Sequence, residues 1–207
     1  MEAAKRAVSD MVEKSVLRPN AVDSITGENP GNCIGKGIPY FSVQEWDKDY
    51  MKVDIILKGG GSENVSAQYS LPYSPLGAGR DLKGVEKVVL DAVFNAQGKG
   101  CSPGIVGVCI GSDRANGYAA AKKALFSGLD SVNPDPEIAD LEKRIVSRAN
   151  ELGIGPMGFG GKTTLLGAKV VVEHRHPASF FVSVAYNCWA YRRRSMKING
   201  KGEVSYD

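Results

Sequence analysis

GIGPMGFGGKTTLLGAKVVVEHRHPASFFVSVAYNCWAYRRR spans residues 153–194 and decides the fold that we expect for this chain. A glycine-rich turn opens the stretch. Two apolar, β-branched segments follow at residues 168–173 and 181–186, which predicts two strands. The stretch also holds both histidines of the chain, a cysteine and a basic run. We therefore expect functional side chains in the loops at the ends of these strands.

The glycine turn imitates two nucleotide-binding motifs. Residues 153–158 fit the string G-x-G-x-x-G, which in dinucleotide-binding proteins follows a strand and opens a helix. Here a predicted helix precedes the string and a predicted strand follows it, so the order is inverted. Gly161-Lys162-Thr163 resembles the end of a P-loop, but that motif requires glycine where this chain has Pro156. Two interpretations stay open: a flexible turn, or bare backbone that approaches an anion beside Lys162.

The segment His174-Arg175-His176-Pro177 closes the first predicted strand. On a strand, the two imidazoles would share one face and the guanidinium would take the other. Such groups suit proton transfer, metal ligation or carboxylate binding. Two interpretations are open, a functional cluster and a polar, solvated strand end.

The four cysteines have irregular spacings and include no C-x-x-C motif. A structural zinc site and a disulfide framework are therefore poorly supported. Cys109 lies within an apolar run and is predicted to be a core residue. Isolated cysteines in turns rich in glycine and proline are compatible with an iron–sulfur cluster whose ligands come from distant loops.

Composition limits the classes of function. The chain has 207 residues, 43% hydrophobic and 24% charged, with a formal net charge of +3. This small charge gives no support for nucleic-acid binding, and we interpret Arg192-Arg193-Arg194 as a solvated end or a subunit contact. No apolar run reaches the roughly 20 residues of a membrane span, and the residues after Met1 do not show a signal-peptide pattern.

Apolar periodicity predicts a mixed α/β (α+β) fold with short strands, helices packed on them, and a site built from glycine-rich loops at strand ends. We expect one domain over residues 1–207, with residues 196–207 as a flexible tail. Lys58-Gly59-Gly60-Gly61 follows a predicted strand and is either a hairpin turn or bulge, or a nest of amides for an anion. Helices are expected at 2–14, 82–96, 115–126 and 136–152; further strands at 38–46, 52–57 and 105–110; and loops at 24–36 and 68–80.

Five motifs in this order carry a resemblance that covers nearly the whole chain. The chain resembles the alpha subunit, or N-terminal catalytic domain, of the class I iron–sulfur fumarate hydratase and L(+)-tartrate dehydratase family. The motifs are KGGGSEN at 58–64, GCSPGIVGV at 100–108, LGIGPMGFGGKTT at 152–164, HRHPAS at 174–179 and NCWA at 187–190.

The resemblance implies a cytoplasmic hydro-lyase with a [4Fe–4S] cluster that hydrates or dehydrates a small dicarboxylate, fumarate/malate first and tartrate/oxaloacetate next. By motif, Cys101 and Cys188 match two of three cluster ligands. Arg18 in its LRPN segment, the Gly60-Gly61 backbone and His176 match substrate-binding groups. The family places its catalytic base on a beta partner, so we expect an oligomer with a beta subunit and no catalytic residue in this chain.

One departure from the family stands out. The first cluster cysteine of the family lies in a C-Q-D-T-G motif upstream of the LRPN segment, and this chain has no such motif. We therefore expect the C-terminal portion of an alpha subunit, whose third ligand lies in a missing N-terminal segment, with Cys33 as a less favoured substitute. Two other hypotheses stay open: a scaffold of the same fold without a cluster, and a phosphate- or nucleotide-binding module built on the glycine turns.

Overall fold

The computed structural model describes residues 1–206, and Asp207 lies outside the described residues. The chain divides into two compact units, one of Met1–Asp49 and one that begins at Tyr50, and the expectation of one domain stays a prediction. The second unit contains a four-stranded mixed sheet and a three-stranded antiparallel sheet. Together with the helices these sheets make an α+β fold, as the sequence predicted.

The first unit contains helix α1 (Glu2–Glu13), which buries Val12, followed by irregular chain. The predicted helix at 2–14 and the predicted loop at 24–36 are confirmed. The predicted strand at 38–46 is wrong, because this segment forms only an isolated bridge between Gly35 and Ile38. Its apolar side chains Tyr40 and Val43 are exposed. An alternating pattern does not make a strand where no neighbouring strand pairs with it.

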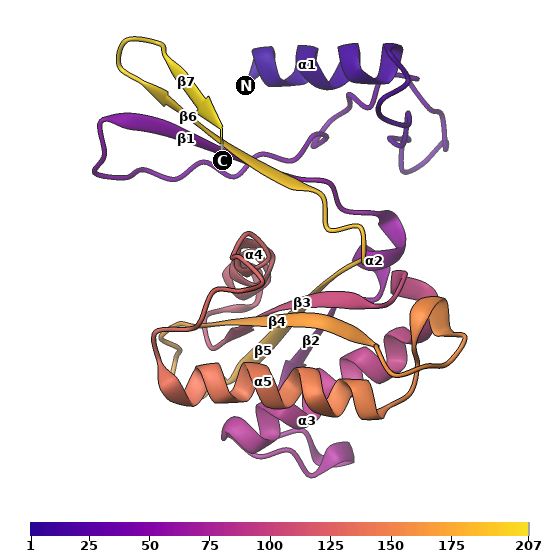
Figure 1. The fold of residues 1–207 in the computed structure, drawn as a ribbon, viewed down its shortest axis with the longest axis vertical. Helices are drawn as coiled ribbons and strands as arrows, with labels where there is room; N and C mark the ends of the chain where they lie inside the picture. The colour runs from indigo at the N-terminus through magenta and orange to yellow at the C-terminus, as the bar shows by residue number, and fades with distance from the viewer. Residues whose placement is uncertain (207) are drawn as a thin grey trace. The chain divides into compact units, whose positions relative to one another are not determined.

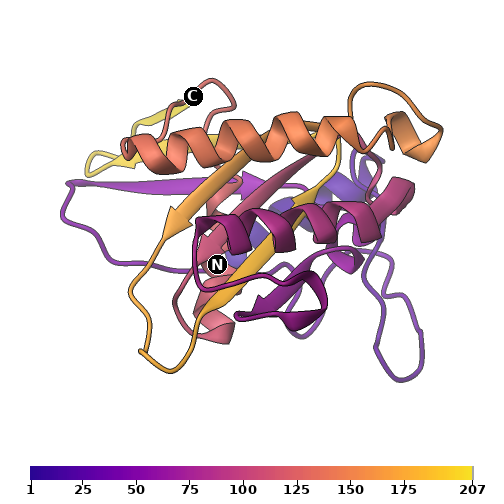
Figure 2. The same ribbon diagram turned by 90° about the horizontal axis from the view of Figure 1, so that it is seen from below.

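The four-stranded sheet has the order β2 (Ala67–Ser70), β5 (Phe181–Asn187), β3 (Gly104–Ile110), β4 (Leu165–Val172). Strands β3 and β4 are parallel, whereas β5 runs antiparallel to both of its neighbours. Figure 1 shows α4 (Arg114–Ala124) on one face of this sheet and α3 (Leu82–Ala96) with α5 (Pro136–Glu151) on the other. Figure 2 shows α3 and α5 side by side from below.

Alternation along the strands assigns side chains to these two faces. Val106 and Val108 of β3 pack with α3 and α5, whereas Ile105 and Cys109 pack with Ala121 of α4. Cys109 is therefore a core residue, as predicted. Its burial raises the pKa of its thiol to about 12, and Glu173 adds to the rise.

Local sequence explains where helices α3, α4 and α5 begin. Asp81, Asp113 and Asp135 each occupy the N-cap position and accept a hydrogen bond from a backbone N–H of the first turn. Pro136 then starts α5 at a position that needs no intrahelical N–H partner. The predicted helices at 82–96, 115–126 and 136–152 agree with the structure within two residues at each end.

The second sheet includes strands in the segment that we expected to be a flexible tail. Strands β6 (Arg193–Asn199) and β7 (Val204–Tyr206) form an antiparallel sheet with β1 (Tyr50–Ile56), in the order β1-β6-β7. Tyr191 and Arg193 also donate hydrogen bonds to the carbonyl oxygens of Leu125 and Ser127. The partner of β6 lies far away in the sequence, so its polar composition alone indicated a tail.

Short elements replace two predicted loops. The glycine run is neither hairpin nor bulge, because Gly60–Asn64 forms the one-turn helix α2. The region 68–80 contains most of β2 and the 3₁₀ turn η1 (Ser74–Leu76). Further 3₁₀ turns are η2 (Gln97–Gly100) and η3 (Pro156–Gly158). Among the described residues, no helix has the length and apolar character needed to cross a bilayer.

Candidate functional site

Cys101 and Cys188 meet at one end of the four-stranded sheet. Cys101 follows η2 with a left-handed backbone (φ 59°) and precedes β3, and Cys188 comes directly after β5. The antiparallel register pairs Ile105 with Asn187, so the start of β3 lies beside the end of β5. The N–H of Trp189 donates to the carbonyl of Cys101 over 3.2 Å. Both thiols are free and partly exposed.

Tyr186 lies against the backbone on either side of Cys101. A Cβ at Gly100 would lie 2.5 Å from Tyr186 Cε1, and a Cβ at Gly104 would overlap Tyr186 Cζ and Oη. Tyr186 is 2% exposed, and its hydroxyl has no hydrogen-bond partner among the described residues. Burial raises the pKa of Tyr186 to about 12, and the nearby Cys101 and Cys188 add to the rise.

Asn187 is the second buried polar residue beside the cysteines. Its Oδ1 accepts a hydrogen bond of 3.0 Å from the N–H of Cys188, which fixes the chain just after β5. Its Nδ2 is buried and lacks a partner in the described part of the chain. Two side-chain donors that face no acceptor therefore adjoin the two cysteines.

Helix α2 brings the glycine run to the same end of the sheet. A Cβ at Gly61 would lie 2.8 Å from the carbonyl oxygen of Lys99, two residues before Cys101. Gly60 and Gly61 are exposed. The contact requires glycine, so the packing of α2 on η2 explains one residue of the run.

Charged side chains flank α2. Lys58 Nζ lies 2.7 Å from one carboxylate oxygen of Glu63, and Lys122 Nζ lies 2.6 Å from the other. Burial lowers the pKa of Lys58, and Glu63 offsets part of the effect. Cys188 also acts electrostatically on this ammonium, so positive charge lies near that thiol.

The glycine turn at 153–161 packs against the segment that carries Cys101. Ser102 Oγ donates a 2.6 Å hydrogen bond to Gly155 O, and the N–H of Met157 donates 2.8 Å back to Ser102 O. A Cβ at Gly98 would overlap the carbonyl of Met157. The turn follows α5 and leads into β4, the inverse of a dinucleotide fingerprint. The interpretation as a structural turn accounts for these contacts.

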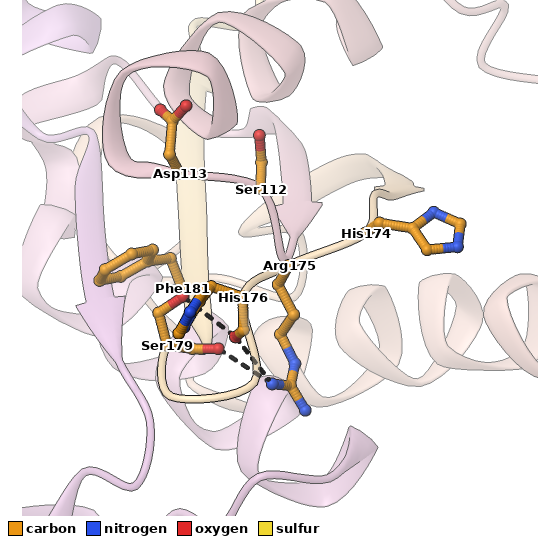
Figure 3. Close-up of a pocket in the computed structure, with 7 residues that line it drawn as sticks. All are labelled: Ser112, Asp113, His174, Arg175, His176, Ser179 and Phe181. Carbon is orange, nitrogen blue, oxygen red and sulfur yellow. Dashed lines mark hydrogen bonds between the residues drawn. The ribbon is translucent and has the colours of Figure 1, made fainter.

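His176 lies at the opposite end of the sheet. β5 separates it from Cys188, and a seven-residue strand is roughly 20 Å long. Figure 3 shows His176 at an open pocket of about 330 Å³. The pocket is lined by Ser112, Asp113, His174, Arg175, His176, Ser179 and Phe181.

Residues 174–180 form a loop rather than the predicted strand end. Arg175 donates hydrogen bonds of 3.0–3.2 Å to three carbonyl oxygens of this loop, those of His176, Pro177 and Ser179. Figure 3 shows the bonds to His176 and Ser179. Arg80 also donates to the carbonyl oxygen of Pro177 and donates to one more, that of Ala178. His176 Nδ1 accepts a bond from the N–H of Ala178, whereas His174 points away from Phe181. The two histidines therefore do not share a face.

Arg18 and Cys33 lie in the unit of Met1–Asp49. The Cys33 thiol donates to the carbonyl of Arg18 over 2.8 Å and accepts a 3.0 Å bond from the N–H of Asn20. The Arg18 side chain is exposed. Their roles in substrate binding and cluster ligation stay predictions.

The structure thus brings Cys101, Cys188 and the Gly60-Gly61 backbone together and leaves His176 apart. No group of three or more His, Cys, Asp or Glu side chains among residues 1–206 converges as a metal site. Sequence reasoning missed the buried donors of Tyr186 and Asn187. The available signal was their position, since Tyr186 and Asn187 end an apolar strand directly before Cys188.

Comparison with known proteins assigns the chain to a family. The family model described as fumarate hydratase (fumerase) matches residues 1–197. A protein of Geobacillus stearothermophilus named for fumarate hydratase class I is 55% identical over 207 residues, which are 98% of this chain and 40% of that protein. One of Methanocaldococcus jannaschii named for L(+)-tartrate dehydratase subunit alpha is 36% identical over 96% of this chain and 68% of its own length.

The L(+)-tartrate dehydratase subunit alpha of Escherichia coli K12 is 30% identical over 199 residues, which are 94% of this chain and 63% of the relative. The chain thus spans between two fifths and about two thirds of the length of these relatives. The family match covers the first unit as well as most of the second. The chain belongs to the fumarate hydratase (fumerase) family.

Proposed function

We propose that this chain is part of a hydro-lyase that reversibly hydrates or dehydrates a small dicarboxylate, with Cys101 and Cys188 as two ligands of a [4Fe–4S] cluster. The single observation that carries the proposal is the meeting of these two cysteines beside two buried donors without partners. The names of the relatives support the reaction class and leave fumarate and tartrate as alternative substrates.

The residues at this end of the sheet fit such a cluster in part. Thiolates are the usual ligands of iron–sulfur clusters, and cluster sulfur accepts hydrogen bonds of the kind that Tyr186 and Asn187 can donate. The third ligand is proposed to come from outside residues 50–206. A C-Q-D-T-G segment of the same enzyme is our first candidate, and Cys33 is the second.

When bound, the cluster supplies a Lewis-acidic iron for the hydroxyl and carboxylate of the substrate. The chain's own residues are proposed to bind and orient the substrate. The backbone amides of the exposed Gly60 and Gly61 are proposed to hold a substrate carboxylate, because a Cβ position at Gly60 faces open space. The ammonium of Lys58, held by Glu63, adds positive charge beside Cys188.

Arg18 and His176 are proposed to bind substrate carboxylate by charge-assisted hydrogen bonds. His176 lies at the opposite end of β5, so its proposed contact cannot reach a substrate held at Cys101 within one rigid unit. The proposal for His176 therefore stands on the motif alone, and it needs its own kinetic test.

The catalytic base is proposed to lie on a beta partner, since two of the relatives are named as alpha subunits. An oligomer of alpha and beta chains follows from this proposal. We place the enzyme in the cytoplasm, where reducing conditions keep cysteines free for metal binding. Neither nucleic acid nor membrane is part of the proposal.

A scaffold of the same fold without a cluster is the alternative function. The observation that favours it is that two cysteines, and not three, come together in the described residues. Such a chain would still assemble with a partner but would contribute no metal.

Iron and acid-labile sulfide per chain, measured after strictly anaerobic reconstitution, test the proposal. We expect about four of each together with the broad visible absorption of a [4Fe–4S] cluster. A beta chain added to the loaded protein should then support hydration of fumarate or dehydration of tartrate. Little or no iron would mean that this chain holds no cluster without the C-Q-D-T-G segment, and it would favour the scaffold as the function of this chain by itself.

A further inference from the structure

Tyr186 presents a buried hydroxyl whose hydrogen bond is missing. A buried donor or acceptor left unsatisfied destabilises the fold, so native proteins rarely retain one without a partner. Tyr186 is 2% exposed, and no acceptor for its hydroxyl exists in the described chain. The adjacent Asn187 shows the same feature at its Nδ2, which can only donate. The missing partner is therefore a group that accepts hydrogen bonds.

The position of this hydroxyl is fixed by packing. The ring fills the space left by the absent side chains of Gly100 and Gly104, which lie on either side of Cys101. The backbone N–H of Tyr186 donates to Ser66 Oγ over 3.1 Å. The hydroxyl therefore cannot turn away to find solvent and stays beside the two cysteines.

Sulfur atoms are the acceptors that best fit the Tyr186 hydroxyl and the Asn187 Nδ2. Thiolates and inorganic sulfides accept hydrogen bonds, and both would be present at Cys101 and Cys188 once iron and sulfide are bound. We propose that the Tyr186 hydroxyl donates a hydrogen bond to a sulfur atom of the cluster and so positions and retains it. This inference rests on the proposed function, since it requires a cluster at these cysteines.

Tyr186 is a positioning residue in this proposal, because it acts on the metal group and not on the substrate. A hydrogen bond to sulfur stabilises the more negative, reduced cluster and therefore raises its reduction potential. Outer-shell hydrogen bonds also hold the metal, and their loss typically weakens metal retention 10–100-fold.

The variant Tyr186→Phe removes only the hydroxyl and keeps the ring that fills the space at Gly100 and Gly104. In the metal-free chain it should leave the melting temperature unchanged or raise it, because the lost group had no partner. Tyr69→Phe is the matched control. Tyr69 donates a 2.8 Å hydrogen bond to Asp91 Oδ2, so the control should lower the melting temperature.

In the reconstituted full chain without substrate, Tyr186→Phe should release iron to a chelator about tenfold faster or more. Its midpoint potential should fall, and Tyr69→Phe should change neither quantity. Tyr186→Phe would then leave the metal-free chain as stable as before and weaken iron retention in the loaded chain. This combination would show that the hydroxyl bonds to the bound group and not to the protein.

Four outcomes would overturn the inference. Destabilisation of the metal-free chain by Tyr186→Phe as large as that of Tyr69→Phe would mean that the hydroxyl has a partner within the chain. A loaded variant with unchanged potential and iron release would mean that the hydroxyl does not serve the cluster, and a change in KM alone would assign it to the substrate. If the unsubstituted chain binds no iron, both the proposed function and this inference fail. If that chain binds iron and Tyr186→Phe behaves like it, only the inference about Tyr186 fails.

Discussion

The two ends of the four-stranded sheet differ in how their polar groups are used. At one end, where β5 finishes, Tyr186 and Asn187 present buried donors without partners beside Cys188. At the other end, where β5 begins, Arg175 donates all the hydrogen bonds recorded for it to carbonyl oxygens of its own loop. At the first end the buried donors have no acceptor, whereas at the second end carbonyl oxygens of the loop accept the hydrogen bonds of Arg175.

This difference changes which end looks functional. In the sequence, the segment His174–Pro177 is the denser cluster of ionisable groups. In the structure, its guanidinium stabilises an irregular loop, and Arg175 and Arg114 also stack on Phe180 and Phe181. Unsatisfied donors next to metal-binding side chains indicate a site better than the number of charged residues does.

The largest effect is expected at the cysteine end. Cys188→Ser should reduce iron per chain after reconstitution from about four to nearly zero, because serine replaces a thiolate ligand. Cys109→Ala is the matched control, since Cys109 is buried within β3 and packs against α4. Equal iron contents in Cys188→Ser and the unsubstituted chain would remove Cys188 from the ligand set.

The contribution of Cys109 to folding stability should depend on pH. Its pKa is raised by burial from 9.0 to about 12, so the thiolate forms more readily in the unfolded chain. Its contribution to stability is complete below pH 9.0 and is lost as the pH rises toward about 12. The full shift corresponds to at most about 4 kcal/mol.

Urea unfolding between pH 8 and 11 measures this effect, with the range chosen roughly around the ordinary thiol pKa. The free energy of unfolding should fall less steeply with pH in Cys109→Ala than in the unsubstituted chain. Parallel curves would show that the Cys109 thiolate is accommodated in the fold.

His176→Asn tests whether the two ends serve one reaction. In an assembled alpha–beta enzyme, we expect kcat/KM to fall about 100-fold if His176 binds a substrate carboxylate. His174→Asn is the control, because His174 points away from Phe181 and the loop (Figure 3). Unchanged kinetics in His176→Asn would restrict the active site to the cysteine end.

The smallest effect is expected from Arg80, whose hydrogen bonds hold the loop of residues 174–180. Arg80→Met removes hydrogen bonds to the carbonyls of Leu71, Pro177 and Ala178 and should cost about 1–3 kcal/mol. Hydrogen exchange should speed up in residues 174–180, while iron loading stays the same. Loss of iron in Arg80→Met would show that the two ends are coupled through β5.

Local sequence predicted the helices well. Helices α3 and α5 have an apolar stripe, and α3, α4 and α5 each begin after an aspartate that caps the helix, so their boundaries depend on neighbouring residues. Strands β3, β4 and β5 were also predicted, because buried strands are continuous apolar runs.

Prediction failed where pairing with a distant segment decides the structure. β6 is polar and partly exposed, and it forms a strand because β1 pairs with it along seven residues. Residues 38–46 have a strand-like composition but no neighbouring strand, and they remain irregular. Gly60 begins a helical turn because its neighbour Gly61 can pack against Lys99 without a side chain.

The sequence by itself determined the α+β class, the long helices, the buried strands and the family, because these depend on local patterns and ordered motifs. Only the tertiary structure decided that Cys101 and Cys188 are neighbours and that His176 is not. The antiparallel register of β3 and β5 places these residues, and no local pattern encodes a register between distant strands. The unsatisfied donors of Tyr186 and Asn187 likewise appear only once the chain has folded around them.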